Sequence, residues 1–288
     1  MSDNKASDLG NVEATPGSPK KDPILTIDNV VRSFGGLRAV DIDHLEVQLG
    51  IITAFIGPNG AGKTTLFNLI TGFDKPDSGK WAYHQLKNAT SWTTDLSGLR
   101  PHQIANKGMV RTFQLTKSLA KMTVMDNMLL GAAEQKGESL RNALLPSRWR
   151  QQEKTILGKA EDLLERFKLS HMTDEYAATL SGGQRKLLEM ARALMSEPKL
   201  ILLDEPMAGV NPVLVESLLT HIENLRDEGV SVLFIEHDMD AIMAISDWIV
   251  VLAEGQVIAE GTPSDVSKNP AVIDAYLGSA IAEELKDV

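Results

Sequence analysis

One short segment limits the possible folds of this chain more than any other: Gly57-Pro58-Asn59-Gly60-Ala61-Gly62-Lys63-Thr64. It fits the pattern G-x-x-x-x-G-K-[ST], and it lies between the β-branched run Ile51–Ile56 and an apolar run with helical spacing. The glycines let the backbone fold so that its N–H groups converge on an anion, where a Cβ atom would not fit. The following helix points its N-terminal dipole at the same anion. The segment therefore predicts a loop that binds the phosphates of a nucleoside triphosphate.

The side chains at the end of this loop have expected roles. Lys63 should reach the β- and γ-phosphates, and the Thr64 hydroxyl should complete the coordination of Mg²⁺ at the start of a helix that begins over Lys63–Thr65. The alternative is a glycine-rich turn followed by a surface lysine. That alternative requires neither the strand before the loop nor the helix after it, and both are indicated here.

A pair of acids ends another apolar run, because Asp204 and Glu205 follow Leu200–Leu203. In an open α/β sheet, ligands bind at the C-terminal ends of the strands. Asp204 would hold Mg²⁺ through water, and Glu205 could take a proton from the attacking water. Apolar strands often end in acids, so the pair becomes informative only beside the phosphate loop. A phosphotransferase or a GTPase would share both features, but the chain contains no Asn-Lys-x-Asp guanine-binding motif.

Apolar runs and helical spacings alternate along the rest of the chain. Ser231–Ile235 is apolar on both faces, as a buried parallel strand should be, and Ile249–Leu252 with Gln256–Ala259 predicts a hairpin. Asn211-Pro212 predicts the cap and first residue of a helix. We therefore expect an α/β fold of the P-loop NTPase (RecA-like) class, with a mostly parallel sheet, an antiparallel β part and an inserted helical subdomain.

Composition and spacing also predict the domain boundaries. Residues 1–22 are polar and rich in Ser, Asn, Gly and Pro, which predicts a disordered tail. We expect the main domain over 23–265, the helical subdomain over about 116–184, and a C-terminal helical tail over 266–288 that opens at Asn269-Pro270. No window of 18 continuous apolar residues predicts a membrane span, and the N-terminus lacks the apolar core of a secretory signal.

The charge and the cysteine count exclude several classes of function. The formal charge is −10, whereas sequence-independent nucleic-acid binding normally needs a basic surface. The absence of Cys excludes disulfides, thiolate metal sites and Cys nucleophiles, and it fits a reducing compartment. We therefore expect a soluble intracellular protein that does not bind nucleic acid.

A second anion site is predicted by Leu180-Ser181-Gly182-Gly183-Gln184, which comes directly before a helical run. A hydroxyl and glycine N–H groups at a helix N-terminus suit an anion, although a plain Ser-Gly-Gly helix cap is the alternative. With this pentapeptide the chain resembles the nucleotide-binding subunits of ATP-binding-cassette (ABC) transporters from about Ile24 to Ala280. The matching positions follow the order of that family: Phe34, Gly57–Thr65, Gln114, Leu180–Gln184, Asp204-Glu205 and His237.

The resemblance implies a head-to-tail dimer in which each ATP lies between the P-loop of one subunit and the Ser181–Gln184 motif of the other. It also implies that Phe34 stacks on adenine, although an aromatic residue is more often buried. Gln114 would approach Mg²⁺ and the lytic water and relay ATP occupancy to a membrane partner. His237, at the end of a predicted strand, would contact the γ-phosphate.

One loop departs from the pattern of the family. Many members have Ser-Ala-Leu-Asp where this chain has Ala208-Gly209-Val210-Asn211. Ala208 and Asn211 thus replace a hydroxyl and a carboxylate at the subunit interface, which leaves the communication through this loop open. Asn211 remains a good helix N-cap.

A narrower resemblance is carried by Glu205–Pro212, Ile235–Met239, Arg111–Gln114 and the closing run Asn269–Gly278. These segments resemble the LivG-type ATPases of bacterial branched-chain amino-acid importers. That resemblance implies a second ATPase subunit (or a second copy of this chain), two membrane permeases, indirectly a substrate-binding protein, and a peripheral position at the cytoplasmic face of the inner membrane. A urea or amide importer stays possible, because no residue of such a subunit touches the cargo.

Two other classes of protein are alternatives. A soluble ABC ATPase of DNA repair would carry a long coiled-coil insertion between the P-loop and the pentapeptide, and only residues 65–179 lie there; a role in cofactor assembly is the other soluble case. A regulatory module that binds ATP without hydrolysing it does not need Glu205 and His237, which are both present.

Overall fold

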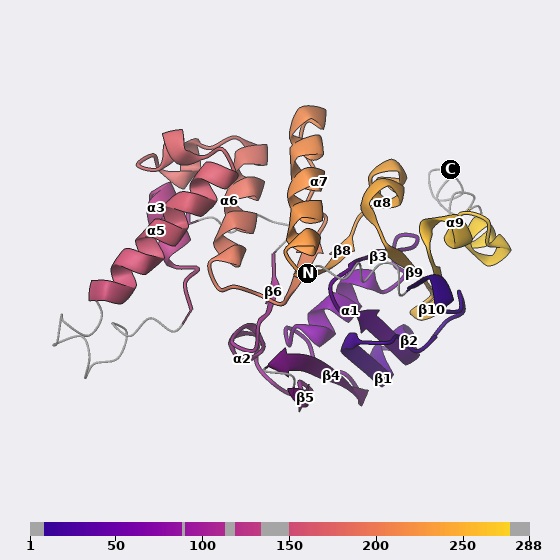
Figure 1. Cartoon of the computed structure of the whole chain (residues 1–288). Helices are drawn as coiled ribbons and strands as arrows, with labels where there is room; N and C mark the ends of the chain where they lie inside the picture. Colours follow the sequence, from indigo (N-terminus) through magenta and orange to yellow (C-terminus); the bar gives the residue numbers. More distant parts are fainter. Residues whose placement is uncertain (1–8, 88–89, 113–118, 134–149, 277–288) are drawn as a thin grey trace.

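The computed structural model describes residues 9–87, 90–112, 119–133 and 150–276 (Figure 1). The strands are β1 (Pro23–Phe34), β2 (Leu37–Gln48), β3 (Ile52–Ile56), β4 (Ser78–Lys87), β5 (Thr90–Asp95), β6 (Met109–Arg111), β7 (Leu200–Asp204), β8 (Ser231–Ile235), β9 (Trp248–Ala253) and β10 (Gln256–Gly261). The helices are α1 (Lys63–Ile70), α2 (Pro101–Ala105), α3 (Val124–Leu129), α5 (Arg150–Arg166), α6 (Gly182–Leu194), α7 (Pro212–Asp227), α8 (Met239–Ile245) and α9 (Pro263–Val266), with short 3-10 turns at Ser170–Met172 and Ala177–Thr179.

The larger sheet has six strands in the order β10-β9-β3-β8-β7-β6. Neighbouring strands from β9 to β6 run parallel, and β10 returns antiparallel as the predicted hairpin. Every residue of β3, β7 and β8 is buried, because apolar clusters cover both faces of this sheet. The predicted P-loop α/β fold is confirmed.

The smaller sheet is antiparallel and has the order β2-β1-β4-β5. Together with α1 it covers one face of the larger sheet, where Trp81, Phe55 and Phe67 are fully buried. This is the antiparallel part that we expected.

Helices α3, α5 and α6 gather to one side of the two sheets (Figure 1). Their apolar faces pack together through residues such as Met128, Leu164 and Leu187. Helix α6 continues to Leu194, beyond the expected limit of about 184. The domain boundaries themselves stay predictions.

The structure differs from the expected disordered tail over residues 9–22. Leu9 is buried, and the Lys20 ammonium lies 3.0 Å from the Glu260 carboxylate with both side chains fully buried. The Lys20 backbone N–H also donates to the Glu46 carboxylate at 2.6 Å. These partners lie in β10 and β2, far along the chain, so the local polar composition that predicts disorder does not reveal them.

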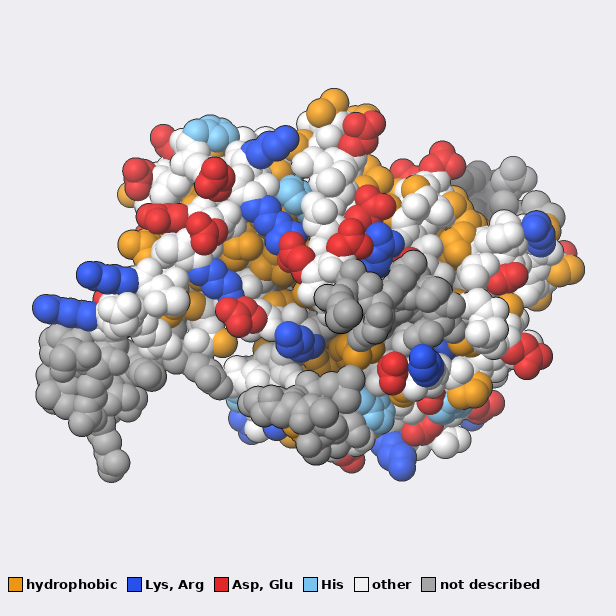
Figure 2. Space-filling view, viewed as in Figure 1, with side chains coloured by type: hydrophobic (Ala, Val, Ile, Leu, Met, Phe, Trp, Pro, Cys, Tyr) orange, Lys and Arg blue, Asp and Glu red, His pale blue; other side chains and the backbone are white. Residues whose placement is uncertain are grey.

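The topology brings four segments of interest to one edge of the larger sheet. The P-loop follows β3, the acid pair ends β7, His237 follows β8, and Arg111 ends β6. Parallel strands end at the same edge, which is where ligands bind in such sheets. On the face shown in Figure 2, acidic and basic side chains are interspersed. Among the described residues, no helix has the length and apolar character needed to cross a bilayer.

Candidate functional site

The P-loop between β3 and α1 has the backbone that its glycines permit. Gly57, Gly60 and Gly62 have φ values of +145°, +81° and +98°. A Cβ atom on Gly57 would collide with the carbonyl oxygen of Leu252, and one on Gly62 would collide with that of Ala39. Gly62 is also the N-cap of α1, and no side chain caps this helix. The N–H groups of its first turn are therefore available to an anion.

Lys63 lies inside this loop. Its ammonium donates to the carbonyl oxygens of Gly57 at 2.6 Å and Pro58 at 2.9 Å, and only 6% of the residue is exposed. Burial lowers the pKa of the Lys63 ammonium, and the charge of Glu205 opposes that shift. A cation is thus held beside the N–H groups of the loop, as phosphate binding requires. Thr64, the next residue, is exposed at the start of α1.

The acid pair divides into a buried and a semi-exposed carboxylate. Asp204 ends β7 and is 2% exposed; its Oδ2 accepts from Nη2 of Arg111 at 2.7 Å. Its Oδ1 has no hydrogen-bond partner among the described residues. Glu205 has a left-handed backbone with φ of +47°, and its Oε1 lies 3.1 Å from Nε2 of His237. Glu205 directly follows β7, and His237 lies two residues after the end of the neighbouring strand β8, so these two side chains meet at one edge of the larger sheet.

The oxygen groups near the P-loop fit Mg²⁺. A hydroxyl at Thr64 and the unpartnered carboxylate oxygen of Asp204 are ligands of the kind that Mg²⁺ prefers. No cluster of three or more His, Cys, Asp or Glu side chains among the described residues would hold a metal ion. Mg²⁺ is often held by one or two protein groups together with substrate phosphates, and Thr64 and Asp204 offer two such groups.

Glu236 is a buried acid that the sequence reasoning missed. Its Oε1 accepts from the backbone N–H of Met207 at 2.7 Å, and its Oε2 accepts from that of His237 at 3.1 Å. Burial raises the pKa of Glu236, while these two hydrogen bonds act in the opposite direction. One carboxylate thus joins the loop after Glu205 to the residue after β8. Its position directly before His237 was the only available signal.

Phe34, at the end of β1, presents its ring to solvent. The residue is 49% exposed, and the guanidinium of Arg32 lies 4.5 Å from the ring centroid. An exposed aromatic ring flanked by a cation offers a flat surface to a nucleobase. This exposure removes the alternative of an ordinary core phenylalanine.

The Ser181–Gln184 motif forms the N-terminus of α6. Ser181 is the N-cap, and its Oγ accepts from the Gln184 N–H at 3.2 Å while Gln184 Oε1 accepts from the Ser181 N–H at 2.8 Å. Gly182 is exposed, whereas a Cβ atom on Gly183 would collide with the Leu214 side chain. The first glycine therefore faces solvent, and the second allows α6 to pack on α7.

Three further positions named in the sequence analysis are Gln114, Ala208 and Asn211. Gln114 lies outside the described residues, which end at Thr112 in this part of the chain. Asn211 caps α7, because its Oδ1 accepts from the Leu214 N–H at 3.0 Å, as the sequence predicts. Ala208 is exposed in the loop before it.

The C-terminal part of the chain reaches the P-loop, which sequence reasoning also missed. The helix that begins at residue 270 carries Tyr276, whose ring packs against the core that contains Ile56. Burial raises the pKa of the Tyr276 hydroxyl, and a hydrogen bond from the backbone of Gly57 opposes that shift.

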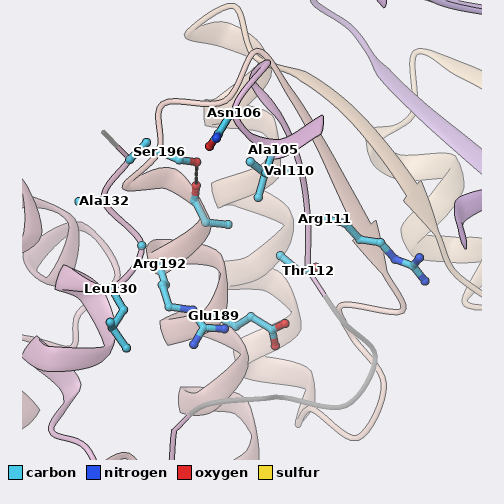
Figure 3. A pocket seen from close by; sticks show the side chains of 13 residues that line it. Ala105, Asn106, Val110, Arg111, Thr112, Leu130, Ala132, Glu189, Arg192 and Ser196 are labelled. Carbon is cyan, nitrogen blue, oxygen red and sulfur yellow. Dashed lines mark hydrogen bonds between the residues drawn. The ribbon is translucent and has the colours of Figure 1, made fainter. Parts of the chain in front are cut away.

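A cavity of about 350 Å³ lies between α2, β6 and α6, at the side of the helical segment (Figure 3). Its walls carry Leu130, Ala132 and Ala193 together with Asn106, Glu189 and Arg192. Thr112 lines the cavity and lies two positions before Gln114 in the sequence. The cavity is thus a mixed apolar and polar surface next to the expected relay segment.

Comparisons with known proteins match most of the chain. Residues 40–208 match the family described as "ABC transporter", and residues 256–282 match "Branched-chain amino acid ATP-binding cassette transporter". The chain is 44% identical over 260 residues to the probable branched-chain amino acid transport ATP-binding protein LivG of Archaeoglobus fulgidus, covering 90% of this chain and 97% of the relative.

Two further relatives agree. The chain is 40% identical over 261 residues to the high-affinity branched-chain amino acid transport ATP-binding protein LivG of Escherichia coli K12, covering 90% and 99%. A crystal structure of the ADP conformation of an ATP-binding cassette of an ABC transporter superposes with a TM-score of 0.74 at 40% identity, covering 89% of this chain and 99% of that chain. The family match over 40–208 spans the P-loop, the Ser181–Gln184 motif and the acid pair.

Proposed function

This chain belongs to the ABC transporter family, and from this premise we propose that it is the ATP-hydrolysing subunit of an importer for branched-chain amino acids. Membership of the family makes it a nucleotide-binding ATPase that serves transport. The observation that carries the hydrolytic role is the 3.1 Å contact between Glu205 and His237 at the edge that also bears the P-loop. A module that only binds ATP does not need this pair.

The proposed reaction begins with the phosphates of ATP in the P-loop. Lys63 exchanges its bonds to the carbonyl oxygens of Gly57 and Pro58 for phosphate oxygens, and the N–H groups of the loop bind the same anion. The loop backbone holds these N–H groups in place before ATP arrives. They therefore stabilise the negative charge of the transition state with little reorganisation.

Glu205 is the proposed general base. Its carboxylate accepts a proton from the attacking water while His237, whose side chain is exposed, orients the carboxylate through their 3.1 Å contact. Thr64 and Asp204 would hold Mg²⁺, which neutralises phosphate charge when bound. Phe34 would stack on the adenine ring.

The partner in the closed state is a second ATPase subunit, either a related chain or a second copy of this one, in a head-to-tail dimer. Ser181 and Gly182 are exposed at the N-terminus of a 13-residue helix. The N–H groups at this helix N-terminus suit a phosphate group. This supports a phosphate of the ATP that is bound in the P-loop of the other subunit. Gln114 is proposed to relay ATP occupancy.

The membrane partners are two permeases, with a substrate-binding protein as an indirect partner. We propose that a permease contacts the cavity in Figure 3, because this mixed surface adjoins the segment that leads to Gln114. ATP-driven closure of the dimer would then move the permeases, and hydrolysis would reset them. The subunit would lie on the cytoplasmic face of the inner membrane as a peripheral protein.

The cargo is proposed from kinship, because the relatives of similar length are named for branched-chain amino acids. A urea or amide importer and a soluble, non-transport ABC ATPase are the competing functions. The test is affinity purification of the tagged Glu205→Gln chain from detergent-solubilised membranes with ATP and Mg²⁺, followed by mass spectrometry. Two polytopic permeases and a second ATPase are expected. Recovery of soluble partners alone would refute the transport function.

A further inference from the structure

Arg111 makes a set of contacts at the nucleotide edge of the sheet that no motif assigns. Its Nη2 donates to Asp204 Oδ2 at 2.7 Å, and its Nη1 donates to Asn68 Oδ1 at 2.7 Å and Thr71 Oγ1 at 3.3 Å. The Arg111 and Asp204 side chains are only 6% and 3% exposed. One guanidinium therefore joins the ends of β6 and β7 to the last turn of the helix that begins with Lys63 and Thr64.

The surroundings hold the plane of this guanidinium. Its central carbon lies 5.6 Å from the ring centroid of Phe67 and 5.9 Å from that of Phe73. A planar fork with fixed donors can bond two acceptors in different directions at once, which an ammonium on a flexible stem cannot do in the same geometry. In Figure 3 the Arg111 side chain points away from the other residues that line the cavity. Its contacts are thus directed to Asp204 and α1 rather than to the cavity.

The bond to Arg111 engages one oxygen of Asp204 and leaves the other oxygen, Oδ1, without a hydrogen-bond partner in the described structure. We propose that Arg111 is a positioning residue that orients the Asp204 carboxylate so that Oδ1 serves the divalent cation of the nucleotide. This inference rests on the proposed function. Groups that orient a metal-facing ligand typically change metal affinity about 10–100-fold when they are removed.

The test measures cation affinity directly, without turnover. Mn²⁺ is titrated into the full chain loaded with the non-hydrolysable analogue AMPPNP, and free Mn²⁺ is followed by electron paramagnetic resonance. Arg111→Met is expected to weaken Mn²⁺ binding about 10–100-fold, while AMPPNP affinity in EDTA stays within about threefold. Arg111→Lys keeps the charge but not the fork, so it is expected to remain at least about fivefold weaker than the natural chain.

Two further variants control for loss of structure. Arg226→Met removes an Arg–Asp pair that lies away from the nucleotide edge, in which Nη1 of Arg226 lies 3.2 Å from Asp247 Oδ1. The Mn²⁺ affinity of this variant should equal that of the natural chain. Asn68→Ala keeps Arg111 and removes one anchor of its guanidinium; it should weaken Mn²⁺ binding in the same direction by a smaller factor.

Three results would overturn the inference: unchanged Mn²⁺ affinity in Arg111→Met, an equal loss of AMPPNP affinity in EDTA, or full rescue by Arg111→Lys. If the natural chain itself fails to bind AMPPNP, the proposed function is refuted, and this inference with it. If the natural chain binds AMPPNP but the Arg111 variants keep its Mn²⁺ affinity, the role of Arg111 is refuted and the proposed function is not.

Discussion

The substitution Lys20→Met tests whether the N-terminal segment is part of the folded domain. In the structure the Lys20 ammonium bonds Glu260 Oε2 at 3.0 Å and the carbonyl oxygen of Ser18 at 2.8 Å, and it lies 4.6 Å from the ring centroid of Trp248. Methionine keeps the apolar stem and removes the charge. The Glu260 carboxylate then stays buried without its cation.

The size of the effect follows from what Glu260 retains. Removing one partner of a buried ion pair typically costs about 3–5 kcal/mol. Glu260 keeps two donors, the Ser18 N–H at 2.9 Å and Trp248 Nε1 at 2.9 Å, which places the expected loss near the lower limit. We therefore expect the free energy of unfolding to fall by about 3 kcal/mol, and the melting temperature by about 6–12 °C at roughly 2–4 °C per kcal/mol.

The assay is urea-induced unfolding followed by circular dichroism at 222 nm, with the same denaturation run on Lys21→Met. Lys21 is exposed, and a surface substitution of this kind changes stability by no more than about 0.5 kcal/mol. A disordered tail predicts that the two variants behave alike. Equal midpoints for Lys20→Met and Lys21→Met would therefore refute the folded segment and restore the expectation from composition.

Three further predictions concern the site and the helical part. Glu205→Gln should keep ATP binding but lower the turnover of a steady-state phosphate-release assay more than about a hundredfold, since the general base is lost; near-normal turnover would remove Glu205 from that role. Phe34→Ala should weaken ATP binding roughly 5–150-fold in fluorescence titrations, with Phe34→Trp close to normal, because base stacking on an aromatic ring contributes about 1–3 kcal/mol. Burial, together with the charges of Arg166 and Lys168, lowers the pKa of His221. The unfolded state therefore binds more protons than the folded state, and the free energy of unfolding should fall as the pH drops below about 6.5. His221→Phe should flatten this pH dependence in urea unfolding at about pH 7.5 and 5.5, and an unchanged dependence would contradict the prediction.

The parts of the fold that the sequence predicts are those with local causes. The P-loop is fixed by glycines within six positions, and the α7 cap depends on Asn211 and a proline next to it. The buried strands of the larger sheet are recognisable because both of their faces are apolar. By contrast, β5 is mostly Thr and Ser with a single tryptophan, and it has no such pattern to predict it.

The contacts that the sequence does not predict join residues that are distant along the chain. Lys20 and Glu260 are 240 positions apart, and Arg111 and Asp204 are 93 positions apart. Taken alone, each of these four charged residues would be expected on the protein surface. Their roles appear only when the topology brings β10 beside the N-terminal segment and β6 beside β7.

The same topology explains why Glu205 has to be held by more than its own strand. Its backbone is left-handed at φ of +47°, which a non-glycine residue adopts only when surrounding contacts enforce it. Three such contacts are present: the Glu205 N–H donates to the Ile235 carbonyl oxygen at 3.0 Å, Lys186 Nζ donates to the Glu205 carbonyl oxygen at 3.0 Å, and Glu236 fixes the N–H of Met207. Lys186 lies on α6, the helix that begins with the Ser181 motif. In the proposed dimer, a movement of α6 would therefore act through Lys186 on the backbone of the proposed general base.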